Sequence, residues 1–169
     1  MIGLMVDLHG TLLESNQAWA KALESIDPDR SEFYRQQIQL KRSRHELAEI
    51  AGVSFDDLQS AYRRFLFPRD EVIGIIRSLS DIYPMVLVTN AERNRVLDDL
   101  EHLQNLPFLR VYTREDGKKP NPIYLQRILD EQGWGEAFLI GNDLTEDYSE
   151  NKKITSIIIP QRKLIEKII

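Results

Sequence analysis

The segment Ile2-Gly-Leu-Met-Val-Asp-Leu-His-Gly-Thr-Leu12 sets the architecture of the chain. It begins as an apolar run that is typical of a buried parallel strand, and the run ends at Asp7. A tight turn with Gly10 and Thr11 follows. Open α/β sheets bind their ligands at the carboxyl ends of the strands, which is where Asp7 is expected to lie. An aspartate that only caps an ordinary strand-to-loop turn is the second interpretation of this segment.

Strand and helix signals alternate over most of the remaining chain. Four more apolar runs have the length of a strand, at residues 84–89, 108–112, 137–140 and 154–159. Because helix-like segments separate them, we expect a parallel α/β sheet covered by helices on both faces. Residues 14–68 carry helix signals only, with Ser15 as the expected N-cap of their first helix. Short helices are also expected from Thr145 and over the tail at 162–169.

The purely helical segment divides the chain into two parts. Residues 1–13 and 69–169 would form an α/β core, and residues 14–68 would form a small helical cap inserted after the first strand. Because the insertion starts shortly after Asp7, it would lie over the carboxyl end of that strand, as a lid does. A length of 169 residues suits one domain with such an insertion.

The composition narrows the classes of protein that remain. A net charge of -5 argues against nucleic acid or an anionic membrane as the main partner. The absence of cysteine excludes disulfides, thiolate zinc sites and cysteine nucleophiles. No apolar stretch reaches the roughly 18 residues of a membrane span. The amino terminus lacks the pattern of a signal peptide, so a cytoplasmic location is expected.

Polar side chains follow the other predicted strands, as Asp7 follows the first. Thr89 ends the second strand, and Lys119 lies in the loop after the third. Asp143 follows the fourth strand, with Asp147 one helical turn later. Since the carboxyl ends of the strands in a doubly wound sheet face one crevice, we expect these side chains to converge.

Such a group of side chains suits phosphoryl transfer. Asp7 and Asp143 are hard oxygen ligands of the kind that Mg²⁺ takes, with water completing its octahedron. Lys119 and the Thr89 hydroxyl would hold a tetrahedral anion in line and neutralise its charge. Asp7 as nucleophile would form an aspartyl-phosphate, which water then hydrolyses.

The same residues resemble the four motifs of the haloacid dehalogenase (HAD) superfamily, in the same order. Val6-Asp-Leu-His-Gly-Thr-Leu12 resembles the first motif, usually written Asp-x-Asp-Gly-Thr. Val86-Leu-Val-Thr-Asn90 resembles the second, and Lys119-Pro-Asn-Pro122 has the Lys-Pro-x-Pro of the third. Leu139-Ile-Gly-Asn-Asp143, followed by Asp147, resembles the fourth.

The resemblance implies a phosphatase that hydrolyses a small phosphorylated metabolite with Mg²⁺ as cofactor. Asp7 would be the nucleophile and a metal ligand, and Asp143 the second protein carboxylate on the metal. Thr89, Asn90 and Lys119 would bind the phosphoryl group. No role for nucleic acid or a membrane is implied, and the oligomeric state is left open.

The resemblance also implies a fold. The core would be Rossmann-like, with its parallel strands in the order 3-2-1-4-5. The helical segment 14–68 is similar in position to the C1 cap of the superfamily. Asp147 would orient Lys119 beneath the bound phosphoryl group.

His9 departs from the first motif, where most phosphatases of the superfamily carry a second aspartate as general acid and base. The metal contact at this position is made by the backbone carbonyl, so His9 remains a candidate metal ligand. An imidazole can itself act as acid and base near neutral pH. Three interpretations stay open: His9 takes over that role, it supports a different chemistry, or activity is lost and the protein only binds a phosphorylated ligand or a protein partner.

Other assignments fit the sequence less well. It contains no Gly-x-Gly-x-x-Gly and no Walker-type loop, which argues against dinucleotide and P-loop sites. A response-regulator receiver would lack the helical insertion, and a metal-free dehalogenase would have no use for Asp143. The basic run Lys41-Arg-Ser-Arg-His45 is either an exposed turn or a cap loop that contacts an anionic substrate.

Overall fold

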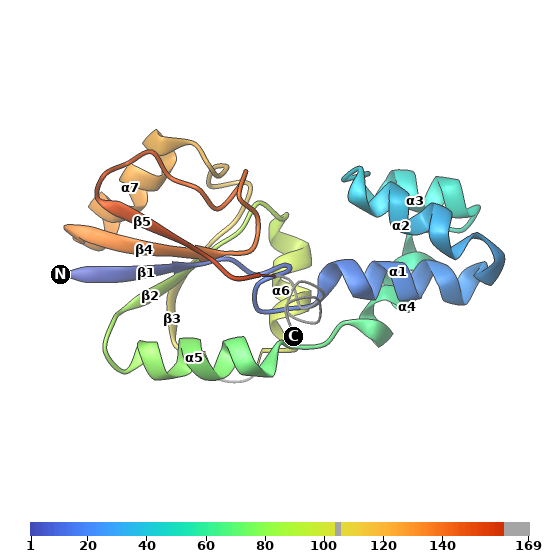
Figure 1. The fold of residues 1–169 in the computed structure, drawn as a ribbon, viewed down its shortest axis with the longest axis horizontal. Coiled ribbons are helices and arrows are strands. Elements are labelled where there is room, and N and C mark those ends of the chain that lie inside the picture. Colours follow the sequence, from blue (N-terminus) through green and yellow to red (C-terminus); the bar gives the residue numbers. More distant parts are fainter. Residues whose placement is uncertain (104–105, 161–169) are drawn as a thin grey trace. The chain divides into compact units, whose positions relative to one another are not determined.

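The computed structural model describes residues 1–103 and 106–160 (Figure 1). They form two compact units. One consists of Met1–Leu12 and the chain from Pro68 onward, and the other is Leu13–Phe67. These boundaries lie one residue from those expected from the sequence. The closing helix expected over 162–169 lies outside the described residues.

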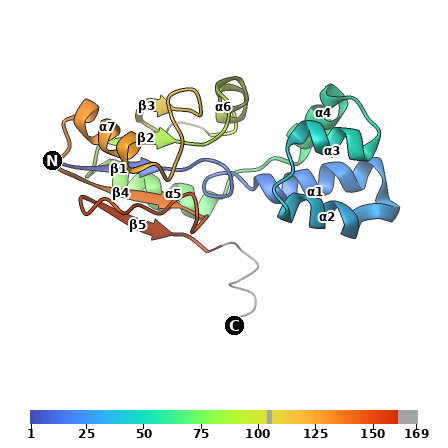
Figure 2. The same ribbon diagram turned by 90° about the horizontal axis from the view of Figure 1, so that it is seen from above.

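The first unit is built around a five-stranded parallel sheet in the order β3-β2-β1-β4-β5. Its strands are β1 (Ile2–Val6), β2 (Met85–Val88), β3 (Phe108–Tyr112), β4 (Glu136–Gly141) and β5 (Ile154–Ile158). Figure 2 shows them side by side, with β3 at one edge and β5 at the other. This order confirms the prediction. The central strand β1 is largely enclosed, and the side chains of Leu4, Met5 and Val6 are fully buried.

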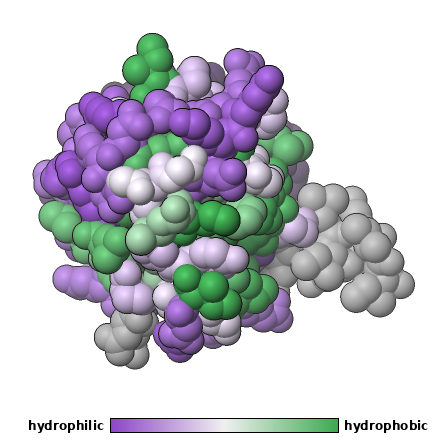
Figure 3. Space-filling model, turned by 90° about the vertical axis from the view of Figure 1, so that its left-hand side faces the viewer, coloured by the Kyte–Doolittle hydropathy of each residue, from purple (hydrophilic) through white to green (hydrophobic). Residues whose placement is uncertain are grey.

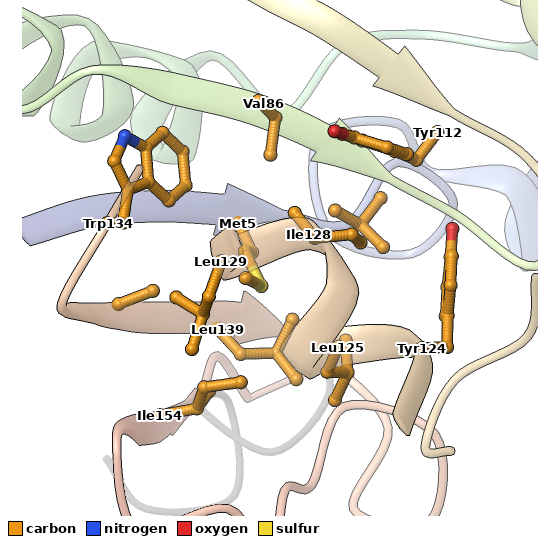
Figure 4. Close-up of a cluster of buried hydrophobic side chains, with 12 residues drawn as sticks. Met5, Val86, Tyr112, Tyr124, Leu125, Ile128, Leu129, Trp134, Leu139 and Ile154 are labelled. Atoms are coloured by element: carbon orange, nitrogen blue, oxygen red, sulfur yellow. The ribbon is translucent and has the colours of Figure 1, made fainter. Parts of the chain in front are cut away.

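Three helices belong to the same unit: α5 (Asp70–Ser80), α6 (Arg93–Leu100) and α7 (Pro122–Gln132). Figure 1 shows α5 and α7 on opposite faces of the sheet. The apolar side of α7, with Leu125, Ile128 and Leu129, packs on Met5 and Leu139 of the central strands (Figure 4). Burying such side chains contributes roughly 1.5–3 kcal/mol each, which holds the strand ends in a fixed relation to one another.

The second unit, residues 13–67, is entirely helical. Its elements are α1 (Ser15–Ile26), the short 3₁₀ helix η1 (Pro28–Arg30), α2 (Ser31–Gln39), α3 (Arg44–Ala51) and α4 (Phe55–Phe65). Helices α1 and α4 pack together, and the rings of Trp19 and Tyr62 stack with centroids 3.9 Å apart. The predicted N-cap was wrong, because Ser15 is the first helical residue and Glu14 caps the helix without a side-chain bond.

Figure 3 shows hydrophobic and hydrophilic side chains side by side on the face it presents. Exposed apolar side chains such as Met1 and Ile82 belong to the scatter that ordinary protein surfaces carry. No helix in the described part of the chain is long and apolar enough to cross a membrane.

Candidate active site

Asp7 lies at the carboxyl end of β1, next to the end of β4. The two strands pair in register, with Val6 opposite Ile140. The Asp7 N–H continues this ladder by donating to the Ile140 carbonyl at 2.9 Å. The pairing therefore brings the first motif beside the segment that starts at Gly141. The Asp7 residue is only 7% exposed, so its carboxylate sits in a largely desolvated place.

Lys119 reaches Asp7 from the loop after β3. Its side chain is almost fully buried, and its Nζ donates to Asp7 Oδ1 at 2.8 Å. The same ammonium also forms an ion pair with the buried carboxylate of Asp147. One cation is thus shared by two carboxylates. In a low-dielectric interior each of these charges depends on the others, because removing one partner leaves a buried charge without compensation.

Burial and the neighbouring charges shift the pKa values of Asp7 and Lys119. Burial raises the pKa of Asp7 to about 6, although the charge of Lys119 opposes this shift and that of Asp147 adds to it. Burial alone would lower the pKa of Lys119, but Asp7 and Asp147 outweigh it and raise the pKa above its usual value. Lys119 is therefore a permanent cation at neutral pH.

The turn that follows Asp7 contacts the second carboxylate oxygen of Asp7. The Thr11 hydroxyl lies 2.9 Å from Asp7 Oδ2 and 3.1 Å from Asn142 Oδ1, so it links the first and fourth motifs. Gly10 has a φ of 83°, and a Cβ there would lie 2.4 Å from the Asn142 side chain. Glycine is needed at this position for both reasons. Arg69 fastens the turn by donating from Nη1 to the Gly10 carbonyl at 2.7 Å.

Asp147 organises the loop after β4. Its Oδ2 accepts the backbone N–H groups of Asn142 and Asp143, both at 3.0 Å, while Oδ1 faces Lys119. Asp147 thus lies in contact with Lys119, and its predicted role in orienting that side chain stays a prediction. The helix expected from Thr145 is wrong, because residues 144–146 form a turn and Asp147 a bend.

The chain closely resembles known structures across its whole length. A hydrolase from Streptococcus pneumoniae TIGR4 superposes with a TM-score of 0.72 at 16% identity, over 98% of this chain and 96% of that one. A HAD family enzyme from Bacteroides thetaiotaomicron, in complex with magnesium and inorganic phosphate, has a TM-score of 0.65 at 16% identity, with 96% of each chain covered. The chain has the haloacid dehalogenase fold.

A HAD family hydrolase from Deinococcus radiodurans R1, with bound phosphate and sodium, supports the same conclusion. It has a TM-score of 0.67 at 19% identity, over 94% of this chain and 81% of that one. No family model matches the sequence, and no curated protein does. The resemblance inferred from the motifs is therefore confirmed at the level of the fold.

The second motif of this HAD fold lies at the end of β2. Thr89 is buried, and its Oγ1 accepts the N–H of Ala91 at 3.2 Å. The Asn90 amide is directed at the backbone of Lys119: Oδ1 accepts its N–H at 2.8 Å, and Nδ2 donates to its carbonyl at 3.1 Å. Nδ2 also donates to Glu146 at 3.1 Å. The Asn90 side chain thus holds the Lys119 loop, and its predicted role in binding substrate stays a prediction.

The carboxylates of the candidate site are ligands of the kind that Mg²⁺ takes. Among residues 1–103 and 106–160, no three Asp, Glu, His or Cys side chains gather as a closed metal site. Mg²⁺ does not require one, because it commonly binds through one or two carboxylates plus waters and substrate oxygens. Asp143 is half-buried, and its Oδ1 accepts the N–H and hydroxyl of Thr145 at 2.8 and 2.6 Å. These bonds fix a hard oxygen donor in the loop after β4, the strand that pairs with β1, and carboxylate oxygens of this kind are donors that Mg²⁺ takes.

Two residues near the site were missed in the sequence. Thr11 was read only as part of a turn, although its place in the first motif was a usable signal. Asp99 in α6 is fully buried, and its Oδ2 lies 2.7 Å from Nε2 of His9. No local pattern indicated this, because Asp99 belongs to a helix that is polar in sequence. The His9 ring is therefore engaged by a residue that lies outside all four motifs.

The contact between Gly141 and Asp147 yields a prediction. A Cβ on Gly141 would lie 2.0 Å from Asp147 Cγ, so Gly141→Ala must displace the carboxylate. We expect a loss of about 1–3 kcal/mol in the free energy of unfolding, measured by urea denaturation. Gly74→Ala is the control, because nothing lies within 4 Å of a Cβ there and α5 should gain stability. Equal effects of the two substitutions would contradict the prediction.

Proposed function

We propose that this protein is a Mg²⁺-dependent phosphomonoesterase of the HAD type, which acts on a small phosphorylated metabolite through an aspartyl-phosphate at Asp7. The observation that carries the proposal is the buried ammonium of Lys119, shared between Asp7 and Asp147 at the carboxyl edge of the sheet. A nucleophilic carboxylate with a fixed cation beside it is what phosphoryl transfer to a protein requires.

In the first half of the reaction, Asp7 attacks the phosphorus atom. A bond forms between an Asp7 oxygen and phosphorus, and the bond from phosphorus to the ester oxygen breaks. The departing oxygen takes a proton from His9. Lys119 and the Thr89 hydroxyl bind the phosphoryl oxygens and hold the group in line, so that positioning and charge neutralisation supply most of the rate acceleration.

In the second half, water attacks the aspartyl-phosphate. His9 takes a proton from the water as the new bond to phosphorus forms, and Asp7 leaves as a carboxylate. Asp7, Asp143 and the His9 backbone carbonyl would hold Mg²⁺, which supplies charge neutralisation on the phosphoryl oxygens when bound. Asp147 and the Asn90 amide keep Lys119 in place throughout, through its side chain and its backbone respectively.

The proposed substrate class rests on the net charge of the chain and on the ligands named for a similar structure. A net charge of -5 disfavours polyanions such as nucleic acids, so a small phosphate ester suits this chain better. The likeness to a Bacteroides enzyme in complex with magnesium and inorganic phosphate supports the choice of metal and of phosphate as the product. The helical unit at 13–67 would act as the cap that selects the substrate.

A second candidate function rests on His9. If the imidazole cannot replace the usual aspartate, the chain would be a catalytically impaired member that binds a phosphorylated ligand or a protein partner. The specific observation behind it is that the His9 ring is already held by Asp99. The two candidate functions differ in whether the wild type hydrolyses a phosphate ester and in how His9→Asp changes that rate.

One assay separates the two candidates. We expect the wild type to hydrolyse p-nitrophenyl phosphate with Mg²⁺ and to lose that activity when EDTA removes the ion. His9→Asp should change the rate by less than about tenfold, since an imidazole and a carboxyl can both serve as general acid and base. No turnover in the wild type, combined with a large gain in His9→Asp, would instead support the impaired member.

A further inference from the structure

A buried aspartate outside the motifs contacts the residue that departs from them. Asp99 lies in α6, 90 positions after His9, and the Asp99 residue is 0% exposed. Its Oδ2 and the Nε2 of His9 are 2.7 Å apart, while the His9 side chain is 12% exposed. A buried carboxylate carries a large desolvation cost and is kept only where partners compensate for it. His9 is one of these partners.

Arg95 provides a cationic partner from the same helix. Its Nε lies 3.3 Å from the same oxygen of Asp99, one helical turn earlier. Because Arg95 donates to this oxygen, Asp99 Oδ2 acts as an acceptor in the contact. An ionised carboxylate only accepts hydrogen bonds, so the nitrogen of His9 that faces it must carry a proton.

This constraint selects one tautomer of the imidazole. With Nε2 protonated and directed at Asp99, Nδ1 is the ring nitrogen left to exchange a proton. A carboxylate that orients an imidazole in this way also stabilises the imidazolium that forms during acid–base catalysis. Such an effect does not depend on where the carboxylate lies in the sequence.

We propose that Asp99 is a positioning residue for His9, which fixes the ring and its tautomer so that Nδ1 exchanges the proton of the reaction. The proposal rests on the phosphatase function proposed above. In the first half, Nδ1 gives its proton to the ester oxygen as the bond to phosphorus breaks. In the second half, Nδ1 takes a proton from the attacking water. Asp99 keeps its negative charge throughout and touches no substrate.

The first test compares two substrates of different leaving-group strength. Nitrophenolate leaves readily without a proton, whereas an alkoxide needs one. For Asp99→Asn, we expect kcat/KM on an alkyl phosphate to fall about 10²-fold, and that on p-nitrophenyl phosphate to fall far less. Asp98→Asn, the same change at an exposed position of α6, should alter neither value. Equal losses on both substrates would overturn the proposal, because a purely structural role lowers both alike.

A double-mutant cycle tests whether Asp99 acts through His9. Once His9→Gln has removed the imidazole, Asp99→Asn should cost no further activity on the alkyl phosphate. Full additivity of the two losses would overturn the proposal. If Asp99→Asn fails to fold, Arg95→Gln replaces it, with a smaller loss expected in the same direction.

A nitrogen-15 NMR experiment supplies a readout that does not depend on activity. The chain has three histidines, and exposed His45 serves as an internal reference for His9. In the wild type, the His9 Nε2 proton should exchange slowly with solvent, and Asp99→Asn should speed that exchange. Unchanged exchange would overturn the positioning role even in an active enzyme. Slow exchange in a protein without Asp7-dependent turnover would instead show that only the phosphatase proposal fails.

Discussion

Asp7→Asn is expected to abolish phosphatase turnover while leaving the protein folded. The amide has the shape of the carboxylate but does not act as a nucleophile, so the rate should fall by about 10⁴-fold or more. Lys119 keeps its ion pair with Asp147 in this variant, and an amide oxygen can still accept from the Thr11 hydroxyl. The structure around the site should therefore remain. The rate is measured on p-nitrophenyl phosphate with Mg²⁺, and folding by circular dichroism.

Two controls make this result specific. Asp81→Asn is the same chemical change at an exposed position at the end of α5, and it should leave turnover unaltered. Mass spectrometry of acid-quenched wild type should detect a phosphoryl group on Asp7, which the variant must lack. Substantial turnover by Asp7→Asn, at more than a few per cent of the wild-type rate, would rule out a covalent mechanism at this residue.

The sheet was predictable because strand and helix signals alternate without ambiguity. The apolar run before Asp7 is too short for a helix and too continuous for a half-exposed strand, so a buried parallel strand was the remaining choice. Residues 14–68 have no such apolar run and carry helix signals only, so they were expected to form a helical insertion. The likeness to the superfamily motifs then implied the strand order, which the pairing of β1 with β2 and β4 confirms.

Local hydrogen bonding explains where the prediction failed after β4. Thr145 suggested a helix start, but its N–H and hydroxyl both bond to the Asp143 carboxylate two residues earlier. Short polar side chains offer the backbone this alternative to a helix, and here the turn is further held by Asp147. These hydrogen bonds join residues at most five positions apart, yet no periodicity in the sequence shows that they form in place of a helix.

The unpredicted parts of the site share another cause, which is long-range packing. Asp99 is buried only because α6 packs where His9 can reach it, and nothing in the polar sequence Arg93–Leu100 encodes that partner. The Asn90 amide is similar, since its partner is the backbone of Lys119, 29 positions away. The motifs included Asp147, which lies beside Lys119, but they gave no sign of Asp99 beside His9.

Lys119→Met is expected to destabilise the fold as well as abolish activity. It leaves the buried carboxylates of Asp7 and Asp147 facing each other without the ammonium that they share. Removing one partner of a buried ion pair costs about 3–5 kcal/mol, which urea denaturation would measure. Lys118→Met is the matched control, because Lys118 is the exposed neighbour of Lys119. This variant should be as stable as the wild type.

The free energy of unfolding that Lys119→Met loses should grow as the pH rises. The charge of Lys119 lowers the pKa of Asp7, so its removal raises a pKa that burial has already raised to about 6. A carboxyl whose pKa is higher in the folded state than in the unfolded one stabilises the fold below the unfolded value, and this stability is lost as the pH rises through the folded value. The variant should therefore be closest to the wild type near pH 5 and furthest from it near pH 8. A deficit that does not change with pH would contradict this.

A second-site variant separates the structural role of Lys119 from its catalytic one. Asp147→Asn removes one of the two carboxylates that Lys119→Met leaves unpaired, while its amide oxygen can still accept the N–H groups of Asn142 and Asp143. The double variant should regain stability relative to Lys119→Met, because one buried charge without a counter-ion costs less than two that repel each other. It should regain no turnover, since the cation that binds the phosphoryl group is still missing. Recovery of both properties together would mean that Lys119 serves the fold alone.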